Sequence, residues 1–173
     1  FARMAKYGLG MSILYNSPTR KEEAEMLLDA KKVTLEELLG ESDVVSVHCP
    51  LLPETKHLIG DSEFQKMKPL AFLINTARGP IVNEAALAAA LKGGVIAGAA
   101  LDVFENEPKI SPALLRMDNV ITTPHIASAT WEARIEMARM TAENVVDVLI
   151  SNKPPRYLVN TELQNKESIS SLA

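Results

Sequence analysis

Short apolar runs alternate with helical patterns along most of this chain of 173 residues. The runs that predict strands are residues 11–15, 43–47, 71–74, 95–101 and 119–122. Most of them are continuously apolar, as in parallel strands that are covered on both faces. Because strands that alternate with helices are joined by right-handed crossovers, the pattern predicts an α/β fold with a doubly wound parallel sheet.

Two of the predicted helices have ends that can be recognised in the sequence. Thr34 and Glu37 match a capping box, in which each side chain bonds the backbone N–H of the other residue. Asn83 can cap a helix over 84–92, and Gly93 can end that helix in a left-handed conformation.

The longest helical pattern begins after Ser128 or Thr130, either of which can cap it, and runs to about Ile150. Its apolar residues follow one another at intervals of three and four, which predicts one buried stripe. The stripe comprises Ile135, Ala138, Ala142, Val145, Val146 and Leu149.

Composition and charge argue against several classes of function. The formal net charge is −4 and no basic run is present, which disfavours nucleic acid and anionic membranes as partners. No apolar stretch approaches the length of a bilayer span, and no signal peptide is visible. Cys49 is the only cysteine, which excludes an internal disulfide and a zinc site of several cysteines, so we expect no metal. A reducing cytoplasm fits this cysteine content.

In open parallel sheets, ligands bind beyond the carboxyl ends of the strands. The chemically interesting side chains of this sequence gather in the segments that follow its predicted strands. These segments are residues 16–20, 48–52, 75–80, 102–107 and 123–128. The sequence therefore predicts a ligand crevice at this edge of the sheet.

Arg78 lies in one of these segments, between small residues and just ahead of Gly79 and Pro80. An arginine at the carboxyl end of a strand offers a planar fork that matches a carboxylate. The alternative is a surface arginine in a turn, and the spacing alone gives the two interpretations equal weight.

Two further segments offer carboxylates and a histidine. Asp102, Glu105 and Glu107 lie close together, and His125 follows the last predicted strand. A carboxylate bonded to a histidine fixes its tautomer and stabilises its protonated form. The alternatives are a solvated acidic loop and a structural histidine in the core. Because Arg, Glu and His follow three of the strands, we favour a carboxylate grip, an orienting group and a proton donor.

His48 and His57 are weaker candidates. His48 ends a strand ahead of Cys49 and Pro50, and His57 lies in a predicted turn before a short helix. Both are interpreted as structural or peripheral.

Three motifs resemble the D-isomer-specific 2-hydroxyacid dehydrogenases: NTARGPIVNEAALAAAL, GAALDVFENEP and NVITTPHIASAT. They occur in the order of that family, and the resemblance runs from the first helix to about residue 162. Within the family, the chain looks like the glyoxylate and hydroxypyruvate reductases. The resemblance implies a Rossmann-like fold that is incomplete at its N-terminus. It also implies hydride transfer between NAD(P)H and a small 2-oxo acid, with glyoxylate or hydroxypyruvate as the expected substrate.

The resemblance assigns roles to the residues that match the motifs. His125 corresponds to the acid/base, Glu107 to its carboxylate partner and Arg78 to the group that grips the substrate carboxylate. Asp102 corresponds to the aspartate that contacts the nicotinamide carboxamide. The residues expected at the cofactor are Asn16, Ser17, Arg20, Cys49, Pro50, Thr55, Thr76, Ala77, Arg78, Asp102, His125, Ala127 and Ser128.

The dinucleotide fingerprint G-x-G-x-x-G is expected a few residues before FARMAKYG, where the sequence begins. That first stretch is typical of the second half of a helix that ends at Gly8. We therefore expect a piece of a longer protein, inactive by itself. Its expected parts are a nucleotide-binding domain over 1–150 and a C-terminal segment, 151–173, that returns toward a substrate domain.

The segment YNSPTR bears on the choice of dinucleotide. NAD-dependent enzymes commonly carry an acidic residue at the end of this strand, where Asn16 stands here. Asn16 has no charge to repel a 2′-phosphate, and Ser17, Thr19 and Arg20 can bind one, so we expect NADP(H). The alternative is that Asn16 bonds the ribose of NAD and Arg20 only begins the next helix.

Other relatives of the family remain alternatives at this point. Corepressors of the C-terminal binding protein type keep the same three residues, and so do phosphoglycerate and phosphite dehydrogenases. Formate dehydrogenases pair the histidine with glutamine, and Glu107 argues against them. The resemblance further implies a homodimer in the cytoplasm.

Overall fold

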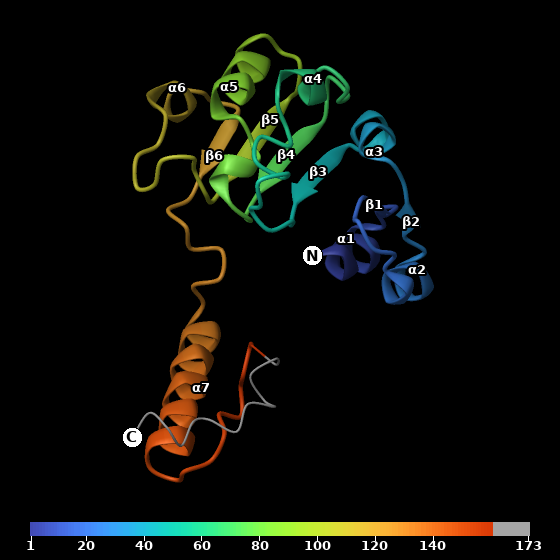
Figure 1. Ribbon diagram of the computed structural model, residues 1–173. Helices are drawn as coiled ribbons and strands as arrows, with labels where there is room; N and C mark the ends of the chain where they lie inside the picture. Colours follow the sequence, from blue (N-terminus) through green and yellow to red (C-terminus); the bar gives the residue numbers. More distant parts are fainter. Residues whose placement is uncertain (161–173) are drawn as a thin grey trace. The chain divides into compact units, whose positions relative to one another are not determined.

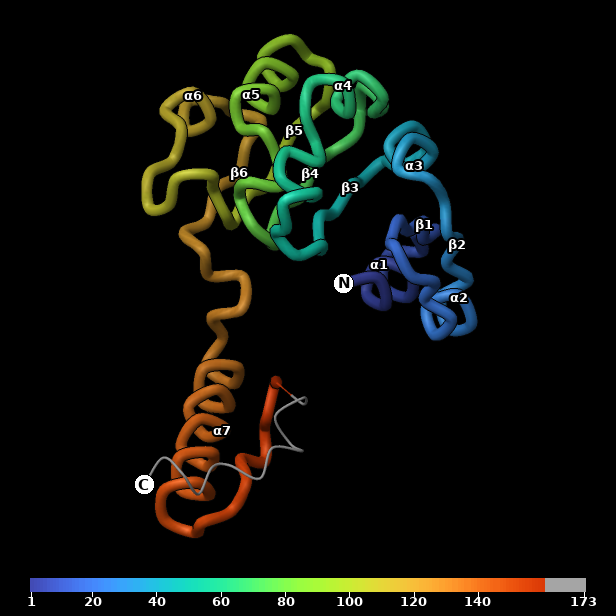
Figure 2. The backbone as a smooth tube through the Cα atoms, viewed as in Figure 1, coloured from blue at the N-terminus to red at the C-terminus, as the bar shows by residue number. Residues whose placement is uncertain are grey.

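The computed structural model describes residues 1–160. The predicted C-terminal segment 151–173 thus lies partly outside the described residues, from position 161 onward. Contacts divide the chain into two compact units, Phe1–His125 and Ile126–Ala173, whose backbone can be followed in Figures 1 and 2.

The first unit contains a four-stranded sheet, with strands β3 (Val44–Val47), β4 (Phe72–Asn75), β5 (Gly98–Leu101) and β6 (Val120–Thr122). All neighbouring pairs are parallel, in the order β3-β4-β5-β6 (Figure 1), which confirms the predicted parallel α/β fold. The last residues of the four strands stand in register across the sheet. The segments that follow them therefore begin at one edge.

Helices connect the four strands, and a hydrophobic core packs helices against the sheet. The connecting elements are α3 (Leu35–Glu41), α4 (Asp61–Phe64), the 3-10 helix η1 (Gly79–Ile81), α5 (Glu84–Lys92) and α6 (Pro112–Leu115). One hydrophobic cluster joins Leu73 of β4 and Leu101 of β5 to Leu87 of α5 and Phe64 of α4. Burying these side chains fixes the strands, and with them the loops at their ends.

The N-terminal part of the same unit forms a separate two-stranded parallel sheet. Its strands are β1 (Leu14–Tyr15) and β2 (Lys31–Lys32), accompanied by α1 (Ala2–Leu9) and α2 (Glu22–Leu28). The predicted strand 11–15 is therefore too long, because only its last two residues pair with β2. The pattern did not predict β2, since both of its lysines are exposed and give no apolar signal.

Both predicted helix caps of the first unit are confirmed. Thr34 accepts a hydrogen bond from the Glu37 N–H, and the Glu37 carboxylate accepts one from the Thr34 N–H. Asn83 Oδ1 accepts the N–H of Ala86 at 3.0 Å and so caps α5. Each bond satisfies a backbone donor that has no partner within the helix.

The first helix ends one residue later than predicted, and α5 ends at Lys92 as predicted but without a left-handed Gly93. The first helix ends at Leu9, and Gly10, with a φ of 66°, is its left-handed cap in place of Gly8. Gly93 has a φ of −81°, so the left-handed residue after α5 is Gly94, at 66°. In both places glycine pairs lie within reach of the end, and spacing alone does not choose between them.

The second unit is built on α7 (Trp131–Leu149), which Thr130 caps by accepting the N–H of Ala133. Its apolar stripe is not buried within the described residues, and that prediction is wrong for this chain. Ile135 is 62% exposed and Leu149 is 76% exposed. The periodicity shows that one face is apolar but not what covers it.

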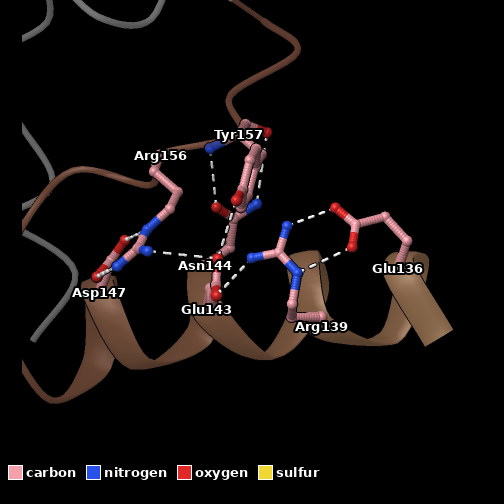
Figure 3. Close-up of polar contacts among 7 residues, drawn as sticks. All are labelled: Glu136, Arg139, Glu143, Asn144, Asp147, Arg156 and Tyr157. Atoms are coloured by element: carbon pink, nitrogen blue, oxygen red, sulfur yellow. Dashed lines mark hydrogen bonds and ion pairs between the residues drawn. The ribbon is translucent and has the colours of Figure 1, made fainter.

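A polar network joins α7 to the segment that follows it (Figure 3). Its members are Glu136, Arg139, Glu143, Asn144, Asp147, Arg156 and Tyr157. Arg156 donates to both oxygens of Asp147, at 2.7 and 2.9 Å, and the Asp147 side chain is almost fully buried. The Tyr157 N–H donates to Asn144 Oδ1 at 3.0 Å. These bonds hold the returning chain along the helix up to Tyr157.

Across residues 1–160, no helix is long and apolar enough to cross a membrane.

Candidate active site

His125 and Glu107 come from two different loops at the carboxyl edge of the four-stranded sheet. His125 Nδ1 lies 2.8 Å from Glu107 Oε2, and the two side chains are 49% and 36% exposed. The other carboxylate oxygen, Oε1, accepts the N–H of Phe104 at 3.0 Å. Glu107 is therefore held by its own loop while it orients the imidazole.

The backbone of His125 is fixed as firmly as its ring. Its N–H donates to the carbonyl oxygens of Asp102, at 2.9 Å, and Thr123, at 3.1 Å. Its φ is 54°, in the left-handed region, where an L-residue is less stable by about 1 kcal/mol. Such residues persist where the surroundings over-determine them and cluster at functional sites.

The charge state of Glu107 follows from these contacts. The hydrogen bond with His125 contributes most to lowering the pKa of Glu107, and the bond from the Phe104 N–H comes next. The positive charges of His125 and Arg78 lower this pKa further, whereas burial opposes the change. Glu107 is thus a carboxylate at neutral pH and can stabilise a protonated imidazole.

Arg78 stands on a turn that a buried asparagine shapes. Asn75, the last residue of β4, is only 1% exposed. Its Oδ1 accepts the N–H of Ala77, and its Nδ2 donates to the carbonyl oxygen of Arg78, both at 3.0 Å. The guanidinium is exposed and donates to the Ala77 carbonyl oxygen at 2.6 Å. Sequence reasoning missed Asn75, although a polar residue that ends an apolar strand was a usable signal.

Gly79 brings this turn against the loop of Glu107. A Cβ atom at Gly79 would lie 1.9 Å from the carbonyl carbon of Phe104 and 2.6 Å from the Glu105 nitrogen. No side chain fits there without moving backbone. Glycine at this position therefore lets the turn of Arg78 and the loop of Glu107 touch directly.

Asp102 is the buried carboxylate of the same edge. It is 4% exposed, and its Oδ1 accepts a hydrogen bond from the Thr123 hydroxyl at 2.6 Å. Its N–H donates to the Asn75 carbonyl oxygen at 3.0 Å, one step beyond the β4–β5 ladder. The Asp102 carboxylate is an acceptor fixed beside His125. It therefore fits the N–H donors of a nicotinamide carboxamide.

The loop after β3 contains three more residues expected at the cofactor. The Thr55 hydroxyl donates to the carbonyl oxygen of Pro50 at 2.7 Å and accepts the N–H of Leu52 at 2.8 Å. These bonds fold the loop onto itself. Burial raises the pKa of the Cys49 thiol. Thr76, which follows β4, is exposed at the same edge.

The candidates after β1 belong to the two-stranded sheet. Asn16 Nδ2 donates to the carbonyl oxygen of Val33 at 2.9 Å. The guanidinium of Arg20 pairs with Glu25 Oε2 at 2.6 Å. Ser17 is half-buried in this segment.

The last two cofactor candidates, Ala127 and Ser128, lie in the second unit.

The two remaining histidines, His48 and His57, have different partners. The ring of His48 bonds Ser46 Oγ at 2.8 Å and lies 5.6 Å from the ring of Phe1. Burial lowers the pKa of His48. His57 Nε2 lies 3.3 Å from an oxygen of Glu105, a contact that the sequence did not predict.

Comparison with known proteins agrees with this arrangement. Residues 1–127 match the family described as D-isomer specific 2-hydroxyacid dehydrogenase, NAD binding domain. The glyoxylate reductase of Thermococcus litoralis is 51% identical over 162 residues, which cover 94% of this chain and 48% of that protein.

Solved structures show the same likeness. The holo form of Rhodotorula graminis D-mandelate dehydrogenase has a TM-score of 0.84 at 42% identity, over 90% of this chain and 46% of that one. The D-lactate dehydrogenase with NAD+ from Lactobacillus jensenii has a TM-score of 0.82 at 29% identity, over 91% and 52% of the two chains. The chain thus spans about half the length of the relatives it matches. From the extent of the family match and the identity to these relatives, the chain belongs to the D-isomer specific 2-hydroxyacid dehydrogenases.

Proposed function

We propose that the protein containing this chain reduces a small 2-oxo acid to a D-2-hydroxy acid with NAD(P)H. The observation that carries the proposal is the 2.8 Å contact between His125 and Glu107, with the turn of Arg78 packed against the Glu107 loop. The likeness to proteins named glyoxylate reductase supports it.

Arg78 binds the carboxylate of the substrate in this mechanism. Its guanidinium is exposed on a turn that Asn75 and Gly79 fix in place. A guanidinium presents two parallel N–H groups, which match the two oxygens of a carboxylate. The carbonyl carbon of the substrate is then held near the imidazole of His125.

His125 supplies the proton. A nicotinamide held at this edge would supply the hydride for the carbonyl carbon. As negative charge develops on the carbonyl oxygen, the protonated imidazole donates its Nε2 proton to that oxygen, which gives the hydroxyl group. Glu107 holds Nδ1 and stabilises the imidazolium until the transfer. Asp102 would hold the nicotinamide amide.

The substrate is expected to be glyoxylate or hydroxypyruvate, following the relatives named glyoxylate reductase. The test is steady-state oxidation of NADPH and of NADH by the complete protein with a panel of 2-oxo acids. Turnover of one of these two acids supports the proposal. Complete inactivity with every 2-oxo acid of the panel would contradict it and favour a binding protein.

NADP(H) is the proposed dinucleotide. Asn16 offers no negative charge at the end of β1, and Arg20, Lys21 and Lys32 surround the segment that follows with positive charge. A 2′-phosphate would have to share Arg20 with Glu25, to which this guanidinium is bonded. Comparing kcat/KM for NADPH and NADH tests the proposal, and a strong preference for NADH would contradict it.

We further propose that the complete protein is a cytoplasmic homodimer. Its nucleotide-binding domain would extend over 1–150, and the segment 151–173 would return toward a substrate domain. Light scattering on the complete protein is expected to give the mass of two chains. The mass of a single chain would rule out the dimer.

A further inference from the structure

A second histidine–glutamate pair uses the loop that carries Glu107. His57 Nε2 lies 3.3 Å from Oε2 of Glu105, two residues before Glu107, which bonds His125. Both histidines have a positive φ, 52° for His57 and 54° for His125. Residues other than glycine rarely adopt this conformation. One short loop therefore holds two histidines that come from distant parts of the sequence.

The other oxygen of Glu105 takes part in a reciprocal pair of hydrogen bonds. Glu105 Oε1 accepts the N–H of Glu84 at 2.7 Å, and Glu84 Oε1 accepts the N–H of Glu105 at 2.5 Å. Each carboxylate thus satisfies the backbone of the other residue. Because the N–H groups in the first turn of α5 have no partner within the helix, one of them depends on Glu105.

His57 also belongs to a segment that is joined to the turn of Arg78. Its N–H donates to the carbonyl oxygen of Pro80 at 2.8 Å, and Ile59 forms a parallel bridge with Val82. The chain around His57, the turn of Arg78 and the loop of Glu107 therefore meet at Glu105. Losing the Glu105 side chain would remove its contacts with His57 and the Glu84 N–H and so loosen this junction.

Two carboxylates of this cluster lie next to each other. Burial raises the pKa of Glu84, and the charge of Glu105 acts in the same direction, although the bond from the Glu105 N–H opposes both. Two adjacent carboxylates repel each other, and the reciprocal hydrogen bonds to the two backbone N–H groups hold them in place.

We propose that Glu84, Glu105 and His57 form a positioning clamp that fixes the Glu107 loop against the turn of Arg78. The proposal rests on the proposed reduction of a 2-oxo acid, because the clamp sets the distance from the substrate grip to the proton donor. None of the three side chains touches the reacting atoms. They act through Arg78, Glu107 and His125 and are positioning residues.

The clamp is tested kinetically in the complete protein. Because small displacements of catalytic groups slow a reaction strongly, Glu105→Ala is expected to lower kcat for the 2-oxo acid by about 10-fold or more. Glu105→Gln keeps an oxygen for the Glu84 N–H and should stay within about threefold of the wild type. The matched control is Glu54→Gln, an exposed carboxylate close to His57 in the sequence, which should leave kcat unchanged. The dinucleotide Kd should be unchanged in all three variants.

A second measurement does not depend on turnover. Amide hydrogen exchange at Glu84, followed by NMR, reports directly on one bond of the clamp. Glu105→Ala should accelerate this exchange by about 10-fold or more, because the N–H loses its acceptor. Glu54→Gln should leave it unchanged.

These measurements distinguish failure of the clamp proposal from failure of the proposed function. An unchanged kcat in Glu105→Ala, or unchanged exchange at Glu84 in that variant, overturns the clamp. A parallel loss of kcat and dinucleotide affinity also overturns it, because it would show general damage. If the wild type reduces no 2-oxo acid, the proposed function fails, and the exchange result alone decides the clamp.

Discussion

Glu107 shows at the scale of one residue how this loop prepares a proton donor. One carboxylate oxygen accepts the Phe104 N–H and the other bonds His125, so the side chain has little freedom to turn. The motif DVFENEP contains two glutamates, and the structure gives them different partners. The family resemblance assigned Glu107 to His125, but the contact of Glu105 with His57 was not predicted, because it depends on how segments far apart in the sequence meet.

The lowered pKa of Glu107 predicts a pH-dependent contribution to stability. A carboxyl group whose pKa is lowered on folding stabilises the native state above its unfolded pKa of about 4.3, and this contribution disappears as the pH falls through the native value. The free energy of unfolding of Glu107→Gln should therefore be below that of the wild type at pH 7. Urea titrations at several pH values should show the gap closing in acid. A gap that stays constant down to about pH 3 would disprove the shift.

Replacing Arg78 with lysine is expected to weaken substrate binding. Arg78→Lys keeps the positive charge but loses the two parallel N–H groups, so KM for the 2-oxo acid should rise by about 10-fold or more. Steady-state kinetics of the complete protein give the comparison. Arg116→Lys, an exposed replacement after α6, is the matched control and should leave KM unchanged. Equal KM values for Arg78→Lys and the wild type would remove Arg78 from the carboxylate grip.

At the scale of elements, the parallel strands bring the site together. The last residues of β3 to β6 stand in register, so the loops that carry Arg78, Glu107 and His125 start from one edge. Apolar runs predicted these four strands because parallel strands are rich in apolar residues, although Phe72 of β4 and Ile121 of β6 are 50% and 69% exposed. They could not predict β2, whose two exposed lysines carry no apolar pattern.

A substitution at Gly79 tests the close contact between the turn of Arg78 and the loop of Glu107. Gly79→Ala places a Cβ on the Phe104 backbone and should destabilise the chain by about 1–3 kcal/mol. Gly40→Ala is the matched control, because the nearest atom to its Cβ is 3.8 Å away and the residue lies within α3. That variant should be neutral or more stable by up to about 1 kcal/mol. Urea unfolding measures both, and similar values for the two variants would contradict the close approach.

At the scale of the whole molecule, more of the candidate site than of the exposed helix surfaces could be predicted from the sequence. The Arg, Glu and His motifs pointed to one sheet edge because topology alone places strand ends together. The partners Asn75, Glu84 and His57 were not predicted, since each acts through contacts between segments far apart in the sequence. The apolar stripe of α7 was predicted as buried and is exposed. Periodicity reports the chemistry of a helix face but does not identify what packs on it.

The proposed reaction depends on His125 as the proton donor. The most direct test is the turnover of NADPH with glyoxylate by the complete protein carrying His125→Ala, alongside its dinucleotide Kd. Because general acid catalysis contributes about 10²–10⁴-fold, kcat should fall by at least about 100-fold in a protein that still binds the dinucleotide. A His125→Ala protein that turns over at nearly the wild-type rate would contradict the account.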